Sequence, residues 1–208
     1  MRGVRGTALV LAAGSSRRMR GANKLTLEID GVAVIARVVD AALASSAREV
    51  IVVTGWEAQA VARALTGRAV RFVHNAAHAS GIGASIASGV RALSPEAECA
   101  WIALGDMPCL EAHHFDALAE RLDPTRGSTI CVPVHAGRRG HPVLFAACHF
   151  PELAALQGDQ GARALLERHA AAVAELVQPD AAVTRDVDTP EQIARLRALP
   201  GAPRLSRA

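Results

Sequence analysis

Aromatic side chains are almost missing from this chain of 208 residues. It has no tyrosine, and phenylalanine and tryptophan together make up only 3%. Proteins that bind single-stranded nucleic acid need aromatic rings on which bases stack, so the composition argues against that class. The formal net charge is only +3, and much of the basic excess lies at Arg17–Arg20 and in the tail. We therefore expect a local anion site and no nucleic-acid partner.

Cysteine is sparse as well. The four cysteines lie far apart and form no CxxC pair, which argues against a structural zinc site and a disulfide framework. Three of them, Cys99, Cys131 and Cys148, have apolar neighbours and are expected to be buried thiols.

Long apolar runs are also absent. The run at 8–13 is too short to cross a membrane, and the basic stretch at 1–7 lacks the apolar core of a signal peptide. We expect a cytoplasmic protein with no membrane partner. Half of the residues are hydrophobic, and no linker interrupts 7–199, so a single domain is expected there. The tail at 200–208, rich in proline and arginine, is expected to be disordered.

Apolar runs and helical spacing alternate along the chain. Buried strands are expected at 8–13, 50–53, 70–73, 100–104, 129–134 and 172–176. Helices are expected at 34–44, 58–65, 84–90, from 111 onward, from 151 to 155 and at 162–169. This order predicts an α/β fold with a parallel sheet and helices on both faces. Ligands of such folds lie beyond the carboxyl ends of the strands, which should bring Gly14, Asn75 and Asp106 to one edge.

The segment after the first strand, Leu9–Lys24, reads LVLAAGSSRRMRGANK. Small residues at Gly14 and Ser15 allow backbone N–H groups to approach an anion, and the arginines and lysine that follow favour a polyphosphate. The alternative is a basic surface turn without a ligand. The segment contains neither the GxGxxG pattern of dinucleotide-binding loops nor the GxxxxGK[ST] pattern of P-loops.

Two later loops offer further candidates. Gly81 and Gly83 precede a helix with Ser85 near its start, which is either a second anion-binding helix terminus or a structural connection. Asp106 stands in Gly105-Asp106-Met107-Pro108 at the end of a strand, where a carboxylate can hold Mg²⁺ opposite a triphosphate. The alternative for Asp106 is a turn or helix cap.

The second half of the chain adds polar loops. Residues 135–142 indicate a hairpin with a basic tip, which either binds an anionic second substrate or is simply exposed. Asp159 precedes a helix and is explained equally by an N-cap. Thr189 and Pro190 mark a helix start, with Thr189 as the N-cap.

The first loop resembles the signature LAAGxSxRMGxxK of MobA-like nucleotidyltransferases, and most closely that of molybdenum cofactor cytidylyltransferases of the MocA type. One departure is Arg20, which stands where the family usually has glycine. The matching residues are Leu11-Ala12-Ala13-Gly14, Ser16, Arg18-Met19 and Lys24. The GDMP, GHP and DxDTPE stretches extend the resemblance along the chain.

The resemblance implies a three-layer, Rossmann-like fold of the nucleotide-diphosphosugar-transferase type, with a mostly parallel sheet. It implies transfer of a cytidylyl group from CTP to molybdopterin with release of pyrophosphate. Arg18, Lys24 and Asp106 would be catalytic, and Asp106 and Asp188 would hold Mg²⁺, with a purely structural cap as the alternative for Asp188. The implied nucleotide-binding residues are Leu11, Ala12, Ala13, Gly14, Ser15, Arg18, Lys24, Asn75, Gly81 and Ser85, and the implied acceptor-binding residues are Gly140, His141, Pro142 and Asp159.

Two alternative functions stay open. A guanylyltransferase that uses GTP belongs to the same family, although its members more often carry LAGG where this chain has LAAG. A nucleotide-binding protein could instead deliver cofactor without chemistry, with a molybdenum hydroxylase as its partner. The retained Asp106 favours catalysis over delivery alone.

Overall fold

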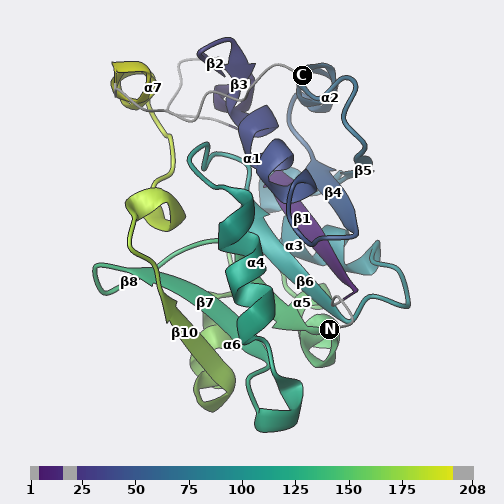
Figure 1. Ribbon diagram of the computed structural model, residues 1–208. Helices are drawn as coiled ribbons and strands as arrows, with labels where there is room; N and C mark the ends of the chain where they lie inside the picture. The colour runs from purple at the N-terminus through teal and green to yellow at the C-terminus, as the bar shows by residue number, and fades with distance from the viewer. Residues whose placement is uncertain (1–4, 16–22, 199–208) are drawn as a thin grey trace.

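Residues 5–15 and 23–198 are described by the computed structural model. Arg18 and the tail at 200–208 lie outside them. The first apolar run forms β1 (Gly6–Ala12) in the middle of the main sheet (Figure 1). Leu9 packs into one apolar cluster and Val10 into another, because successive side chains of a strand point to opposite faces. A strand buried on both faces has to be apolar throughout, which explains the run.

The main sheet has eight strands in the order β10-β7-β9-β6-β1-β4-β5, with β8 paired to β7. Only β9 and β8 run antiparallel to their neighbours. The predicted fold class, a mostly parallel sheet in one α/β domain, is confirmed. The strands besides β1 are β4 (Glu49–Thr54), β5 (Arg71–His74), β6 (Cys99–Leu104), β7 (Ile130–His135), β8 (Arg138–Arg139), β9 (Val143–Ala146) and β10 (Val173–Val177), and a separate hairpin joins β2 (Glu28–Ile29) to β3 (Val32–Ala33).

The order of the strands reverses at β1. The chain passes from β1 to β4 on one side and later returns to β6 on the other side, and both neighbours run parallel to β1. The loops that follow β1 and β6 therefore leave the same edge of the sheet in different directions. A crevice forms at such a switch point, and it is where α/β folds bind ligands.

Helices cover both faces of the sheet (Figure 1). One apolar cluster packs against α1 (Val34–Leu43), α2 (Ala58–Ala64), α4 (Ala112–Arg121) and α7 (Pro190–Ala198). The other packs against α3 (Ile82–Arg91), α5 (Phe150–Ala154) and α6 (Arg163–Arg168). Within the described residues no helix is both long and apolar enough to cross a membrane.

Two expectations need correction. Helix α3 begins at Ile82 rather than Ala84, so Gly83 lies inside it. The loop at 157–160 packs on this end of the helix: the N–H of Gly83 donates to the oxygen of Gly158 at 2.9 Å, and a Cβ on Gly83 would lie 2.7 Å from the oxygen of Gln160. The prediction of a buried Cys148 is wrong, since that residue is exposed.

The other two cysteine predictions are confirmed. Cys99 and Cys131 are buried and all four thiols are free. Burial raises the pKa of Cys99 to about 12 and that of Cys131 to about 11. Both thiols therefore stay protonated and inert at neutral pH.

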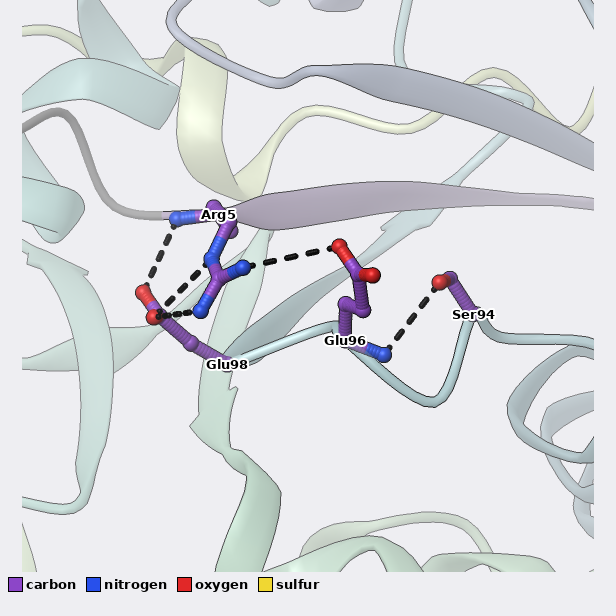
Figure 2. A network of polar contacts seen from close by, with 4 residues as sticks. All are labelled: Arg5, Ser94, Glu96 and Glu98. Carbon is purple, nitrogen blue, oxygen red and sulfur yellow. Dashed lines mark hydrogen bonds and ion pairs between the residues drawn. The ribbon is translucent and has the colours of Figure 1, made fainter.

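At the edge of the sheet away from the crevice, Arg5 ties the start of β1 to the turn before β6 (Figure 2). Its guanidinium donates to Glu98 at 3.0 and 3.1 Å and lies 3.5 Å from Glu96. Hydrogen bonds from the backbone N–H and the guanidinium of Arg5 lower the pKa of Glu98. This exposed network aligns the two strands that flank the switch point at their amino ends.

Candidate active site

A first cavity of about 490 Å³ lies at the switch point, beyond the carboxyl ends of β1 and β6. Its polar lining comes from five segments that are far apart in the sequence. The lining residues are Leu11, Ala13, Gly14, Ser15, Lys24, Leu25, His78, Ala79, Gly81, Ile82, Ser85, Leu104, Asp106, Asp159 and Asp188.

Lys24 connects two carboxylates in this cavity. Its Nζ donates to Oδ2 of Asp106 at 2.5 Å and to Oδ1 of Asp188 at 2.7 Å. Burial alone would lower the pKa of Lys24, but the charges and hydrogen bonds of both aspartates outweigh it and raise that pKa above its ordinary value. Lys24 is therefore a permanent cation. Asn23 presents it by capping a short 3-10 helix, η2 (Lys24–Thr26), through a bond from the N–H of Leu25 at 3.1 Å.

The C-terminal segment is fastened to this site. The N–H of Val187 donates to the backbone oxygen of Asp106 at 2.9 Å. Oε1 of Gln192 accepts from the N–H groups of Asp188 at 2.6 Å and Thr189 at 2.9 Å, while Oγ1 of Thr189 accepts from the N–H of Gln192 at 3.3 Å. The predicted N-cap at Thr189 is confirmed. Gln192, which the sequence analysis missed, completes a capping box and fixes the backbone of Asp188.

The same place suits a divalent cation. Oδ1 of Asp106 is buried and has no hydrogen-bond partner among the residues that the structure describes, whereas its other oxygen is bonded to Lys24. Ligand atoms of Asp106, Asp186 and Asp188 lie within 4.8 Å of one another. Hard divalent cations prefer such carboxylate oxygens. Asp186 was missed by the sequence analysis, although its spacing of two from Asp188 places both on one side of an extended segment.

The glycine loop has no packing reason for its glycine. Gly14 is exposed, its φ is not in the left-handed region, and an added Cβ would meet nothing within 4 Å. Its neighbours Ala13 and Ser15 also line the cavity, whereas Ala12 is buried against the opposite face of the sheet. Open space beside a glycine at a cavity wall is what close approach of a ligand would require.

Asn75 does not line the cavity. It is buried, and its Nδ2 donates to Oγ of Ser85 at 3.0 Å, while its Oδ1 accepts from the N–H of Ala77 at 3.0 Å. Asn75 thus supports Ser85, which does line the cavity. His78 was missed by the sequence analysis: it lines the cavity, and its Nδ1 is buried without a partner.

Gly81 lines the cavity but also has a structural reason to be glycine. Its φ is +119°, and an added Cβ would lie 2.3 Å from the oxygen of Gly158. The loop that follows Gly158 carries Asp159, which lines the first cavity. Asp159 was expected on the acceptor side, and it lines the same cavity as Gly14 and Lys24.

A second cavity of about 580 Å³ adjoins the first, and Ile82 and Leu104 line both. Its floor is mostly aliphatic and its rim carries arginines. The lining residues are Ile82, Ile86, Ile102, Leu104, Arg138, Arg139, Gly140, His141, Val143, Gly161, Ala162, Arg163, Leu166 and Glu167. Gly140 and His141, both expected on the acceptor side, are in this group, whereas Pro142 is buried behind it after a cis peptide bond.

His141 is held by the backbone around it. Its N–H donates to the oxygen of Val183 at 2.8 Å, and its Nδ1 lies 3.3 Å from the oxygen of Ile102. Gly140 must be glycine, because an added Cβ would lie 2.0 Å from the oxygen of Val183. Burial lowers the pKa of His141 despite the Ile102 contact and the nearby charges of Asp106 and Asp186. The ring is therefore neutral at pH 7.

A switch-point crevice with a glycine loop, a buried lysine and a carboxylate cluster defines an α/β protein that handles phosphorylated ligands. The chain belongs to the MobA-like NTP transferase domain family, whose domain matches residues 8–175. It is therefore a nucleotidyltransferase that takes a nucleotide substrate, and the predicted family is confirmed.

Two curated relatives match this chain over nearly its whole length. The chain is similar to purine catabolism protein PucB of Bacillus subtilis, with 35% identity over 90% of this chain and 93% of that protein. It is also similar to nicotine blue oxidoreductase of Paenarthrobacter nicotinovorans, with 31% identity over 91% of this chain and 95% of that protein.

The fold matches a solved structure closely. Rv0371c from Mycobacterium tuberculosis H37Rv superposes with a TM-score of 0.81 at 29% identity, covering 95% of this chain and 100% of the other. Its complex with manganese superposes with a TM-score of 0.76 at 28% identity, covering 94% and 99%.

Proposed function

We propose that this nucleotidyltransferase is a CTP:molybdenum cofactor cytidylyltransferase. An oxygen of the acceptor's terminal phosphate attacks the α-phosphorus of CTP and forms a new P–O bond. The bond from the α-phosphorus to the oxygen that bridges to the β-phosphorus breaks, and pyrophosphate leaves with that electron pair. The acceptor phosphate is already anionic, so no strong general base is required. Catalysis is then mostly positioning and charge neutralisation.

The observation that carries this proposal is the meeting of Lys24, Asp106 and Asp188 beside Gly14. Backbone N–H groups at Gly14 and Ser15 would bind the phosphates. Lys24 would neutralise phosphate charge, together with Arg18, whose role rests on the family motif alone. Ser85, supported by Asn75, and Gly81 would lie along the nucleoside. The functional unit would extend over 7–199, because Asp188 and Gln192 lie beyond the matched domain.

Asp106 and Asp188 would hold Mg²⁺, with Asp186 as a third oxygen donor. The unpartnered Oδ1 of Asp106 supports this assignment, as does the manganese complex of the similar mycobacterial protein. Mg²⁺ bound there supplies positive charge opposite the α-phosphate. Lys24 contacts the same two carboxylates in the free protein and would exchange them for phosphate when substrate and cation arrive.

The second cavity would bind the acceptor. Its aliphatic floor suits a flat heterocycle such as a pterin, and the arginines on its rim suit a phosphate. Gly140, His141 and Pro142 would shape this pocket, and Asp159 would lie at its junction with the nucleotide. CTP is favoured over GTP by Ala13 in the LAAG motif. Delivery of the product to a molybdenum hydroxylase would be a second task of the same protein.

The test is pyrophosphate release by the purified protein with Mg²⁺ and molybdenum-loaded pterin cofactor. CTP, GTP and an acceptor-free sample are compared. Release with CTP that depends on the acceptor is expected. Pyrophosphate release with GTP alone would assign the protein to the guanylyltransferase subgroup. Release with neither nucleotide would overturn the assigned acceptor.

Because one relative is named an oxidoreductase, oxidation of NADH and NADPH is measured in parallel. No nicotinamide oxidation is expected, since the chain lacks the GxGxxG pattern. Nicotinamide-dependent turnover without pyrophosphate release would contradict the proposal.

A further inference from the structure

Two histidines and a glutamate come together outside the lining of both cavities. His149 ends the 3-10 helix η5 (Ala147–His149), Glu152 lies in α5, and His169 follows α6. The segment before η5 is β9, whose Ala146 pairs with Cys99 at the start of β6. The cluster therefore lies at the amino end of β6, whereas Asp106 follows its carboxyl end. It plays no part in the chemistry proposed above.

The three side chains are arranged closely enough to share an ion. One ligand atom from each lies within 4.8 Å of the other two. Nε2 of His169 is 2.8 Å from Oε1 of Glu152. The rings of His149 and His169 have centroids 4.8 Å apart, and their planes are inclined at 63°. Two imidazoles and one carboxylate, with the fourth position left to water, form a known type of zinc ligand set.

The surrounding groups orient these ligands. Oγ1 of Thr129 lies 2.8 Å from Nε2 of the buried His149, which fixes that ring, and Nδ1 of His149 makes no hydrogen bond within the described residues. Arg168 donates to Oε2 of Glu152 at 2.6 Å, which leaves Oε1 to contact His169. Ligand side chains of metal sites are characteristically held by such outer hydrogen bonds. His169 and Glu152 are partly exposed, so an ion can enter from solvent.

We propose that His149, Glu152 and His169 form a Zn²⁺ site that is separate from the active site. The ion would link the start of α5 to the end of α6. The ion would join two segments that flank the loop at 157–161. That loop packs on the first turn of α3, so the site would stabilise the wall shared by the two cavities.

A second histidine cluster serves as the internal comparison. His113, His114 and Asp180 also lie within 4.8 Å of one another. However, Nδ1 of His114 accepts the N–H of Glu111 at 2.9 Å, and its Nε2 faces Asp180 at 3.4 Å. Nε2 is thus directed at the carboxylate of its own cluster, but the rings of His113 and His114 are stacked, with centroids 3.9 Å apart and planes inclined at 37°. The lone pairs lie in the ring planes and do not converge as a tetrahedral site requires, so we expect no tight Zn²⁺ binding there.

The experiment is calorimetric titration of chelator-treated, full-length protein with Zn²⁺. It uses an Asp106→Asn/Asp188→Asn background, so that the active-site carboxylates do not contribute. One Zn²⁺ per chain is expected, with a rise in Tm on binding because the ion binds the folded state. Glu152→Gln or His169→Ala should weaken Zn²⁺ by at least about tenfold, and His113→Ala should leave the affinity unchanged.

Cobalt keeps the inference testable if a variant is poorly folded. Co²⁺ added to the same background should give the intense visible bands of a four-coordinate site. Failure of the background protein to bind Zn²⁺, weak six-coordinate Co²⁺ bands, or binding that His169→Ala leaves unchanged would each overturn the inference.

Discussion

The two cavities open at the same edge of one sheet, yet their linings differ in kind. The first combines a lysine with carboxylates and small residues, whereas the second combines an aliphatic floor with arginines. The first lies at the switch point between the parallel strands β1 and β6. The second lies over β6 and the antiparallel strand β9, with β8 at its rim. The antiparallel insertion thus adds a second binding surface to the parallel half of the sheet.

Under the proposed function, this difference would let one edge of the sheet bind two anionic substrates. In the first cavity the carboxylates would need a cation before a triphosphate could approach. In the second, three arginines outnumber the one carboxylate, that of Glu167, and could meet a phosphate directly. Ile82 and Leu104 contribute to both linings and form the wall between them. Variants that act on one cavity alone are therefore the sharpest probes of the comparison.

Asp106→Asn should have the largest effect. It keeps the shape of the side chain but removes its charge, and it weakens the site whose carboxylate oxygen is buried without a hydrogen-bond partner among residues 5–15 and 23–198. We expect turnover to fall by about 10²–10³-fold, with an unchanged circular dichroism spectrum. Asp30→Asn, in the exposed turn of the β2–β3 hairpin, is the control and should keep full activity. Normal turnover by Asp106→Asn would contradict the assignment of a metal site to the first cavity.

Lys24→Met should separate cation binding from catalysis. Lys24 competes with a divalent ion for Asp106 and Asp188, so its loss should tighten Mn²⁺ binding to the nucleotide-free protein by about tenfold while turnover falls. Mn²⁺ affinity is measured by electron paramagnetic resonance. Lys24 is also the only lysine of the sequence, so amine-reactive labelling of its peptide, separated from the labelled N-terminal peptide, reports its release. Weaker Mn²⁺ binding in the variant would contradict the proposal that the cation replaces Lys24 at Asp106 and Asp188.

Arg138→Gln should affect the second cavity alone. Within the described residues Arg138 has no ion-pair partner, whereas its neighbour Arg139 is bound by Glu175 at 2.8 Å. We expect the KM for the acceptor to rise about tenfold, with the KM for CTP unchanged. Arg139→Gln is the matched control and should raise the acceptor KM less. Equal effects of the two variants would show that net charge, rather than the free guanidinium, matters.

Two glycines distinguish a ligand requirement from a packing requirement. Gly14→Ala should leave the free energy of unfolding within about 0.5 kcal/mol of wild type but weaken CTP binding in calorimetry. Gly105→Ala should lower the free energy of unfolding by about 1–3 kcal/mol. The added Cβ would lie 2.7 Å from Cδ1 of Ile35 and 2.8 Å from the backbone oxygen of Leu11. Urea unfolding compares the two variants. Destabilisation by Gly14→Ala would mean that the loop packs more tightly than described.

The smallest effect is expected from the pH dependence of His141. Burial lowers its pKa below the ordinary value of 6.5. Below that pH the unfolded chain takes up a proton that folded His141 does not, so its contribution to the free energy of unfolding falls on acidification. His141→Asn should lessen the loss of stability between pH 7 and pH 5, measured by urea unfolding. An unchanged pH profile would mean that the ring is solvated.

The fold could be predicted well because its signals are local. Apolar runs such as Val50–Val53 identify buried strands, and the Thr189-Pro190 pair identifies the start of α7. The helix start at Ile82 could not be predicted, because it depends on a loop that packs there from 75 residues further along the chain. The prediction that Cys148 is buried was wrong for a related reason. Apolar neighbours in the sequence do not reveal which side of a short 3-10 helix faces solvent.

The site was only partly predictable. Gly14, Lys24, Asp106 and Asp188 carry motif signals, and the structure brings them into one cavity. The sequence could not show that Lys24 bridges the two aspartates, since that contact depends on three separate chain segments. Asn75 looked like a ligand residue because it follows a strand, but its amide is used to hold Ser85. Gln192 does carry a signal, because Thr189 and Gln192 fit the S/T-x-x-E/Q pattern of a capping box. His78 has no sequence signal distinct from an ordinary surface residue.

The bond between Lys24 and Asp188 spans 164 residues of sequence. A chain emerging from the ribosome completes the strands β1, β4, β5 and β6 by residue 104, but it acquires the second carboxylate only when synthesis reaches Asp188. At roughly 5–20 residues per second, several seconds separate the assembled sheet from the assembled site. A chain that ends between residues 104 and 188 therefore has these four strands but no complete acidic pair, so the proposed site can assemble only after synthesis has passed Asp188.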